Sequence, residues 1–168
     1  MIFNLHTFTI LHVVISLIGI GSGFVVLIGL LTRRRLAGWT ALFLVSTVAT
    51  SVTGFLFPFH GFTPAIGVGI ISLIVLAIAI LARYRGRLAG VWREIYVITS
   101  MVAFYLNFFV LIVQSFQKIP ALKALAPTQS EPPFLVAQVL ALLLFVVLAI
   151  VATVKFRTEP IGGSVLRA

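Results

Sequence analysis

The chain contains no cysteine and very few acidic residues. The absence of cysteine excludes disulfides, thiolate metal sites and thiol catalysis. Only 3 of the 168 residues are acidic, and they are Glu94, Glu131 and Glu159. Paired carboxylates for acid and base catalysis are therefore lacking, as are a nucleophile elbow and a phosphate-binding loop. These absences disfavour the hydrolytic enzymes.

Charged residues of either sign are also scarce. They make up 9% of the chain against 61% hydrophobic residues, whereas about a quarter of a soluble domain is charged. Five apolar segments approach the roughly 20 residues that a transmembrane helix needs, and none alternates as a barrel strand does. We therefore predict an all-α integral membrane protein, a single five-transmembrane-helix bundle. The expected spans cover approximately residues 8–31, 39–57, 64–82, 95–116 and 134–154.

The basic residues predict the orientation of this bundle. A net charge of +9 suggests nucleic acid in a soluble protein, but here the basic residues form short clusters between apolar segments, and no nucleic-acid partner is expected. By the positive-inside bias, the N-terminus lies outside and the tail at 155–168 in the cytoplasm. We assign the clusters this role, and attraction of anionic lipid, rather than a specific anion site. The expected inner residues are Arg33, Arg34, Arg35, Arg83, Arg85, Arg87, Arg93, Lys155, Arg157 and Arg167, against Lys118 and Lys123 outside.

The three histidines all fall on the expected outer side. His6 and His12 stand at the start of the first span, and His60 follows the second. The first span itself lacks the positively charged start of a secretory signal, so we expect it to remain as a membrane helix. His12 and His60 could clamp haem b, and His6 with Glu131 would extend the set to a weak divalent-metal site.

Polar residues form stripes along several expected helices. They recur at three- and four-residue steps, and in the first span they include a small-xxx-small pair that allows close helix approach. We expect the stripes to converge in an outward-facing polar pocket, although such side chains also hydrogen-bond neighbouring helices, at about 0.6 kcal/mol each. The members are His12, Ser16, Gly19 and Gly23; Thr47, Thr50 and Gly54; Tyr96, Ser100, Ala103, Asn107 and Gln114; and Gln138.

A quinone is the other ligand that such a pocket suits. It needs one or two hydrogen-bonding side chains beside an apolar slot, and His12, Ser16, Asn107 and Gln114 are the candidates. The sequence thus predicts an accessory subunit of a larger membrane complex, such as a respiratory one, that binds haem, quinone or metal. A purely structural or assembly subunit and a small homo-oligomeric transporter are the alternatives. Expected partners are membrane lipid and other subunits or copies of the chain.

The longest polar segment, "SFQKIPALKALAPTQSEPPF", fills the expected outer loop at residues 117–133. Pro120 suits the first turn of a helix and Pro127 cannot continue one. We predict a short interfacial helix from about Pro120 to Ala126, with Leu122 and Leu125 toward the bilayer or bundle and Lys123 toward water. The loop either bridges two helix ends or acts as a lid that brings Gln117 and Glu131 to the rim of the pocket.

The same segment carries a resemblance. "NFFVLIVQSFQKIPALKALAPTQSEPPF" resembles a segment of a family of small bacterial multi-pass membrane proteins, with Phe-Gln-Lys-x-Pro-x-Leu followed by Ala-Pro-Thr-x-x-Glu-Pro-Pro-Phe. The resemblance covers about a third of the chain, the fourth span and the outer loop. It implies a bacterial inner membrane and about five helices, and it implies no activity. In such a membrane, the orientation predicted from the basic residues makes the N-terminus periplasmic.

Overall fold

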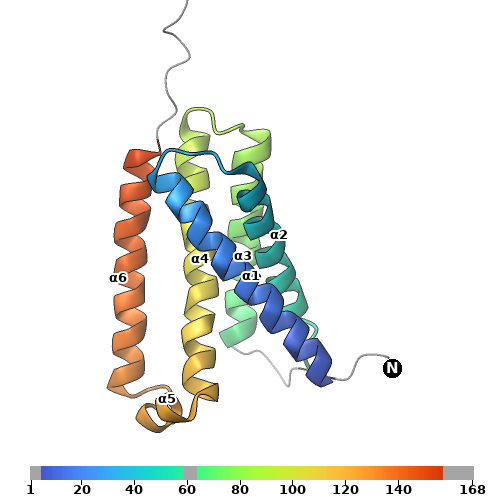
Figure 1. Ribbon diagram of the computed structural model, residues 1–168, viewed down its shortest axis with the longest axis vertical. Helices are drawn as coiled ribbons and strands as arrows, with labels where there is room; N and C mark the ends of the chain where they lie inside the picture. The colour runs from blue at the N-terminus through green and yellow to red at the C-terminus, as the bar shows by residue number, and fades with distance from the viewer. Residues whose placement is uncertain (1–4, 59–63, 157–168) are drawn as a thin grey trace, which may run out of the picture.

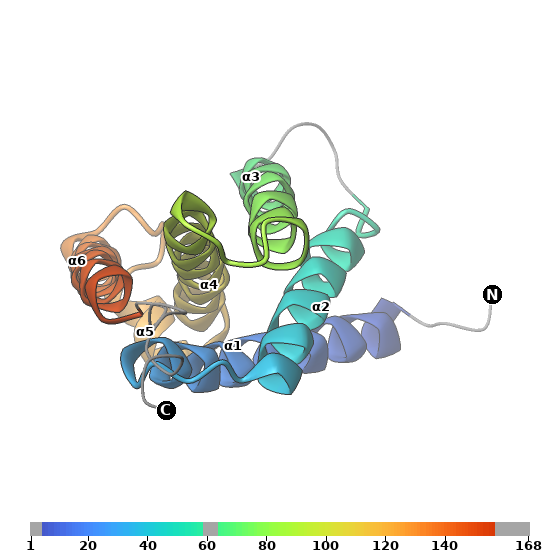
Figure 2. The same cartoon turned by 90° about the horizontal axis from the view of Figure 1, so that it is seen from above.

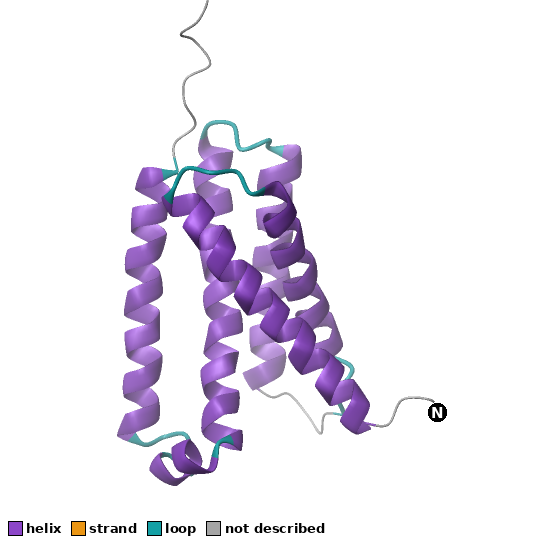
Figure 3. Ribbon diagram, in the orientation of Figure 1, coloured by secondary structure: helices purple, strands orange, loops and turns teal. Residues whose placement is uncertain are grey.

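A computed structural model describes residues 5–58 and 64–156, and within these ranges the chain folds into helices without a strand (Figure 1). Loops join the helices only at the two ends of the bundle (Figure 3). The elements are α1 (Leu5–Leu31), α2 (Ala37–Gly54), α3 (Pro64–Ile80), the π-helical turn η1 (Leu81–Arg85), α4 (Val91–Lys118), α5 (Pro120–Leu125) and α6 (Pro132–Lys155).

Five helices in the described part of the chain are long and apolar enough to cross a membrane: α1, α2, α3 continued by η1, α4 and α6. The prediction of an all-α membrane bundle is thereby confirmed. All five helices extend beyond the predicted spans at one end or both, because hydropathy marks only the part of a helix that suits hydrocarbon. His60 and the tail beyond Phe156 lie outside the described residues.

Helix α4 lies at the centre of the bundle and packs against α1, α3 and α6. Consecutive long helices run in opposite directions, and α1 crosses the face of the others obliquely (Figures 1 and 2). The buried side of α4 follows helical spacing, with Tyr96, Ser100, Ala103 and Asn107 all buried. This part of the predicted stripe therefore faces the bundle interior.

Phe104 of α4 joins four helices at the middle of the core. Its ring makes edge-to-face contacts with Phe24 of α1 and Phe145 of α6, each at a centroid distance of 5.0 Å, and with Phe43 of α2 at 6.1 Å. Such pairs contribute about 0.5–1.5 kcal/mol each beyond burial of their area. Gly23 makes the arrangement possible, because a Cβ there would stand 2.7 Å from the Phe104 ring.

The predicted short helix in the outer loop is present as α5, where it lies between the ends of α4 and α6 (Figure 1). Ile119 precedes it in an extended conformation, and Pro120 opens it. Leu122 is half-buried, whereas Leu125 and Lys123 are exposed. The bundle therefore covers one side of α5, and the other side faces its surroundings.

Candidate functional site

His12 of α1 packs against α2. Its Nδ1 lies 2.8 Å from the Thr53 hydroxyl, and its ring meets Phe57 edge-on at a centroid distance of 5.2 Å. The Thr53 hydroxyl already donates its hydrogen to the Ala49 carbonyl at 2.7 Å. An Nδ1–H on His12 completes this contact by donating to the Thr53 oxygen. His12 is therefore a contact between two helices.

A buried polar seam connects α1, α2 and α4 one to two turns deeper. Ser16 donates to the Asn107 Oδ1 at 3.3 Å. Gly19 lies beside them, and the position of a Cβ there would be 2.9 Å from Asn107 Nδ2 and 3.2 Å from Thr47 Oγ1. In the part of the chain that the structure describes, neither of these two buried atoms has a hydrogen-bond partner. The sequence-based candidates Ser16 and Asn107 thus meet, within a tight helix contact.

Two further candidates, Gln114 and Glu131, do not join them. Gln114 continues the polar stripe of α4 but is exposed, because α1 has diverged from α4 at that depth. Glu131 instead fastens its own loop: its carboxylate accepts bonds from the Thr128 hydroxyl at 2.9 Å and from the amides of Thr128 at 3.1 Å and Ser130 at 3.0 Å. The described residues that we expected to form one polar pocket therefore lie in different parts of the bundle.

These hydrogen bonds control the charge of Glu131. Desolvation raises the pKa of the carboxyl, but the bonds from Thr128 and Ser130 to its charged form outweigh it and hold the pKa below the ordinary range. No group of three or more His, Cys, Asp or Glu within residues 5–58 and 64–156 is placed to hold a metal ion. The role of Glu131 is to hold the loop together through these hydrogen bonds.

The outer loop is tied to α4. Gln129 donates to the Val113 carbonyl at 3.0 Å, and Gln117 donates to Gln129 at 3.3 Å. Together with α5, these contacts hold the loop beneath α4 and α6 (Figure 1), away from the His12 side of α1. The arrangement is a bridge between two helix ends.

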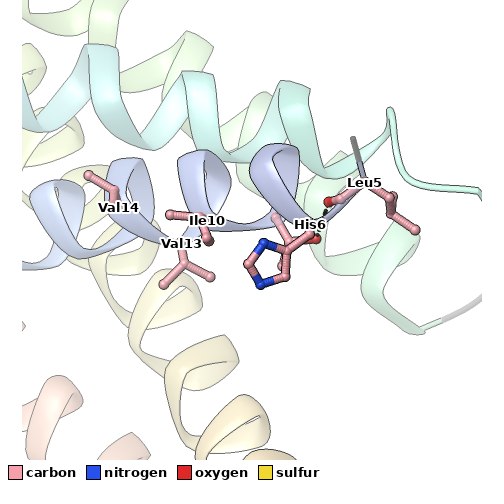
Figure 4. A pocket seen from close by; sticks show the side chains of 6 residues that line it. Leu5, His6, Ile10, Val13 and Val14 are labelled. Atoms are coloured by element: carbon pink, nitrogen blue, oxygen red, sulfur yellow. Dashed lines mark hydrogen bonds between the residues drawn. The ribbon is translucent and has the colours of Figure 1, made fainter. Parts of the chain in front are cut away.

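An open groove with a volume of about 560 Å³ lies instead along the first half of α1, and all of its lining residues belong to this one helix. It is lined by Leu5, His6, Thr9, Ile10, Val13 and Val14 (Figure 4). His6 stands near the start of α1, and Val13 and Val14 lie about two turns further along the helix (Figure 4). His12, six residues beyond His6 and about 120° around the helix, faces α2 instead. The two histidines therefore belong to different surfaces.

This groove was missed from the sequence because its residues are mostly apolar and lie on a part of α1 that the other helices leave exposed. Residues of α1 from Gly19 onward are largely buried, whereas those before it are exposed or half-buried. A hydropathy pattern assigns all of these residues to one helix without indicating where a neighbour departs. The only local signal is His6 with Thr9, spaced to share one face.

The chain matches no protein-family model, no curated relative and no solved structure. The resemblance of its fourth span and outer loop to small bacterial membrane proteins therefore stays a prediction.

Proposed function

We propose that this multi-pass membrane protein holds a quinone, an amphipathic lipid-like ligand, in the groove beside the first half of α1. The observation that carries the proposal is the groove itself, about 560 Å³ in volume, with His6 and Thr9 at its outer end and Ile10, Val13 and Val14 deeper. Ligand sites combine apolar walls with a few polar groups, and α1 supplies one wall of this kind.

The chemistry of the polar end suits both redox forms of a quinone. The Thr9 hydroxyl donates its hydrogen to the Leu5 carbonyl at 2.8 Å, so its oxygen remains an acceptor for a quinol hydroxyl. The His6 imidazole can donate to a quinone carbonyl or accept from a quinol, according to its tautomer. An isoprenoid tail would then run along Ile10, Val13 and Val14 toward the hydrocarbon.

Haem b and a divalent metal have less support. His12 is engaged with Thr53 at 2.8 Å and does not line the groove, and the described residues offer no cluster of metal ligands. His60, the partner that both ligands would need, lies outside the described residues. A quinone requires neither a second histidine nor a carboxylate.

We further propose that the protein is an accessory subunit in a bacterial inner membrane, with its N-terminus periplasmic. The ends of α1, η1 and α6 lie together (Figure 1), and the clusters from Arg33 to Arg35 and from Arg83 to Arg93 accompany them. Lys118 and Lys123 lie at the other end. This separation of charge favours a cytoplasmic location for the arginine end. A reporter protein that works only in the cytoplasm should be active when it is fused after Lys155.

Labelling with a photoreactive quinone tests the ligand. The full chain, reconstituted in phosphatidylcholine nanodiscs, should be labelled within residues 5–14, and excess ubiquinone should suppress the label. Val13→Trp fills the groove and should abolish the suppressible label. Ile28→Trp places the same ring on an exposed part of α1 away from the groove and should leave labelling intact. Uniform labelling of all lipid-facing helices, unaffected by ubiquinone, would sink the proposal.

An assembly role is the second candidate, and the seam formed by Ser16, Gly19 and Asn107 favours it. Ser16 and Asn107 hydrogen-bond each other between α1 and α4, where Gly19 allows a close approach, so their polar groups contribute to helix packing. It predicts that the protein co-purifies with a larger membrane complex. Removing the protein would then destabilise that complex, while Val13→Trp would have no effect on it.

A further inference from the structure

Three arginines from two separate segments of the chain line one small pocket at the arginine end of the bundle. Arg34 and Arg35 come from the connection between α1 and α2, and Arg83 comes from η1. Thr40 of α2 and Tyr96 of α4 complete its polar lining. Arg83 is far from Arg34 and Arg35 in sequence, so only the fold brings the three residues to one pocket.

Within the described residues, no carboxylate forms an ion pair with these three arginines. Glu94 forms an ion pair with Arg93, with 3.0 Å between Arg93 Nη2 and Glu94 Oε1, and Glu131 lies at the opposite end of the bundle. Glu159, the third acidic residue of the chain, falls outside the described residues. Like charges that share a pocket repel one another, and an anion bound among them removes that repulsion and gains charge-assisted hydrogen bonds.

Arg83 is held in place by aromatic rings. Its guanidinium carbon lies 5.4 Å from the ring centroid of Tyr96 and 5.8 Å from that of Tyr84. Tyr96 is 1% exposed and cannot move readily. A guanidinium within about 6 Å of a ring centroid is attracted by the ring, and this contact leaves its N–H groups able to bind an anion. The buried Tyr96 ring therefore restrains Arg83 beside the pocket.

Backbone hydrogen bonds position the other two arginines. The Arg34 amide donates to the Gly29 carbonyl at 2.8 Å and the Thr32 amide to the Ile28 carbonyl at 2.9 Å, while Arg33 adopts a positive φ of 61°. This arrangement ends α1 in a Schellman-type turn, in which a left-handed residue reverses the chain. The reversal carries Arg34 and Arg35 back over the end of α1, toward η1.

We propose that this pocket binds the phosphate group of an anionic phospholipid. The cavity itself has a volume of only about 10 Å³, so the phosphate sits at its mouth, where the Arg34 and Arg35 side chains are exposed. The pocket lies where transmembrane helices end, at the depth of lipid headgroups, and its remaining lining is apolar, with Leu30, Leu36 and other hydrophobic residues. A free phosphate would gain nothing from that apolar lining. The site is independent of the quinone groove at the other end of α1.

Native mass spectrometry of the full chain tests the assignment, with phosphatidylglycerol offered against phosphatidylcholine in detergent. The wild type should retain phosphatidylglycerol. The double variant Arg34→Gln with Arg83→Gln should lower its retention at least about tenfold, since charge-assisted hydrogen bonds are lost. The matched control is Arg33→Gln with Arg85→Gln, which removes the same charge from the same end at residues that do not line the pocket. This control should change retention by less than about twofold.

Two further measurements make the outcome unambiguous. Arg83→Lys keeps the charge but loses the planar donor fork, so it should weaken retention of the lipid while the helical circular dichroism of the protein stays unchanged. Inorganic phosphate should not displace the lipid. Equal losses in the double variant and its charge-matched control would overturn the proposal, because binding would then depend on net charge alone. Displacement by inorganic phosphate would overturn the choice of a lipid.

Discussion

Gly19 of α1 faces the amide of Asn107 so closely that a Cβ on this glycine would lie 2.9 Å from Asn107 Nδ2. Oxygens of Thr47 and Ser46 would lie within 3.3 Å of the same point. The approach of α1 to α2 and α4 therefore depends on the absence of a side chain at residue 19. By contrast, nothing lies within 4 Å of a Cβ placed on Gly21, two residues along the same helix.

Gly19→Ala should destabilise the bundle by about 1–3 kcal/mol, because an added methyl group forces the Asn107 amide and the Thr47 hydroxyl apart. Gly21→Ala serves as the matched control and should be neutral or stabilising by up to about 1 kcal/mol, since alanine restricts the unfolded chain more than glycine does. Unfolding in mixed detergent and SDS micelles measures both. Equal effects of the two substitutions would contradict the close contact.

Asn107→Leu should change the free energy of unfolding by less than about 1 kcal/mol. The substitution removes one hydrogen bond to Ser16, at 3.3 Å, and such bonds are worth about 0.6 kcal/mol inside membrane proteins. It also removes an Nδ2 group that is buried without a partner within the described residues. Asn107→Ala should cost more than the leucine variant because it leaves a void. A large loss with leucine would mean that Asn107 makes a further bond.

The outer loop should loosen in acid. The folded pKa of Glu131 lies below the ordinary glutamate pKa of 4.5, so its contribution to loop stability is present above pH 4.5 and is lost as the pH falls through the folded pKa. Hydrogen-exchange protection factors at residues 119–131, which divide the intrinsic rate at each pH by the observed rate, measure this. Glu131→Gln should lower protection at neutral pH and make it independent of pH. Equal protection factors at both pH values in the wild type would refute the role of the carboxylate.

Arg33→Gly should stabilise the end of α1 by about 1–2 kcal/mol, because glycine adopts the positive φ of 61° without the steric cost borne by a side chain. Arg33→Gln removes the same charge but keeps a Cβ, and it should bring no such gain. Thermal unfolding of the two variants provides the comparison. Equal stability of both would show that the backbone strain at Arg33 is negligible.

Composition and helical periodicity predict most of this fold. Apolar segments and the absence of charge within them predict five membrane helices, and Pro120 with Pro127 predicts α5. Spacing also predicts the buried side of α4, since Tyr96 and Asn107 lie three turns apart on one face. These features are local, or repeat along one helix, and so can be read from a single segment.

The candidate site was less predictable because it depends on how helices cross. Periodicity places His12 and Ser16 on one face of α1, yet His12 contacts α2 and Ser16 contacts α4. Gln114 shares the face of Asn107 but lies where α1 has already departed. Crossing angles follow from side-chain volumes at the contact, here Gly19 and Gly23, and helical periodicity alone does not encode those angles.

The unequal attachment of α1 gives a single helix two different local stabilities. Its second half is enclosed near Phe104. Its first half contacts α2 through His12 with Thr53, and the segment after α2 through Phe8 with Phe57. Segments with few buried contacts open at lower free energy than a packed core. Amide protection should therefore rise along α1 from Leu5 to Leu31, so that the end facing the groove opens many times before the remainder of the helix does.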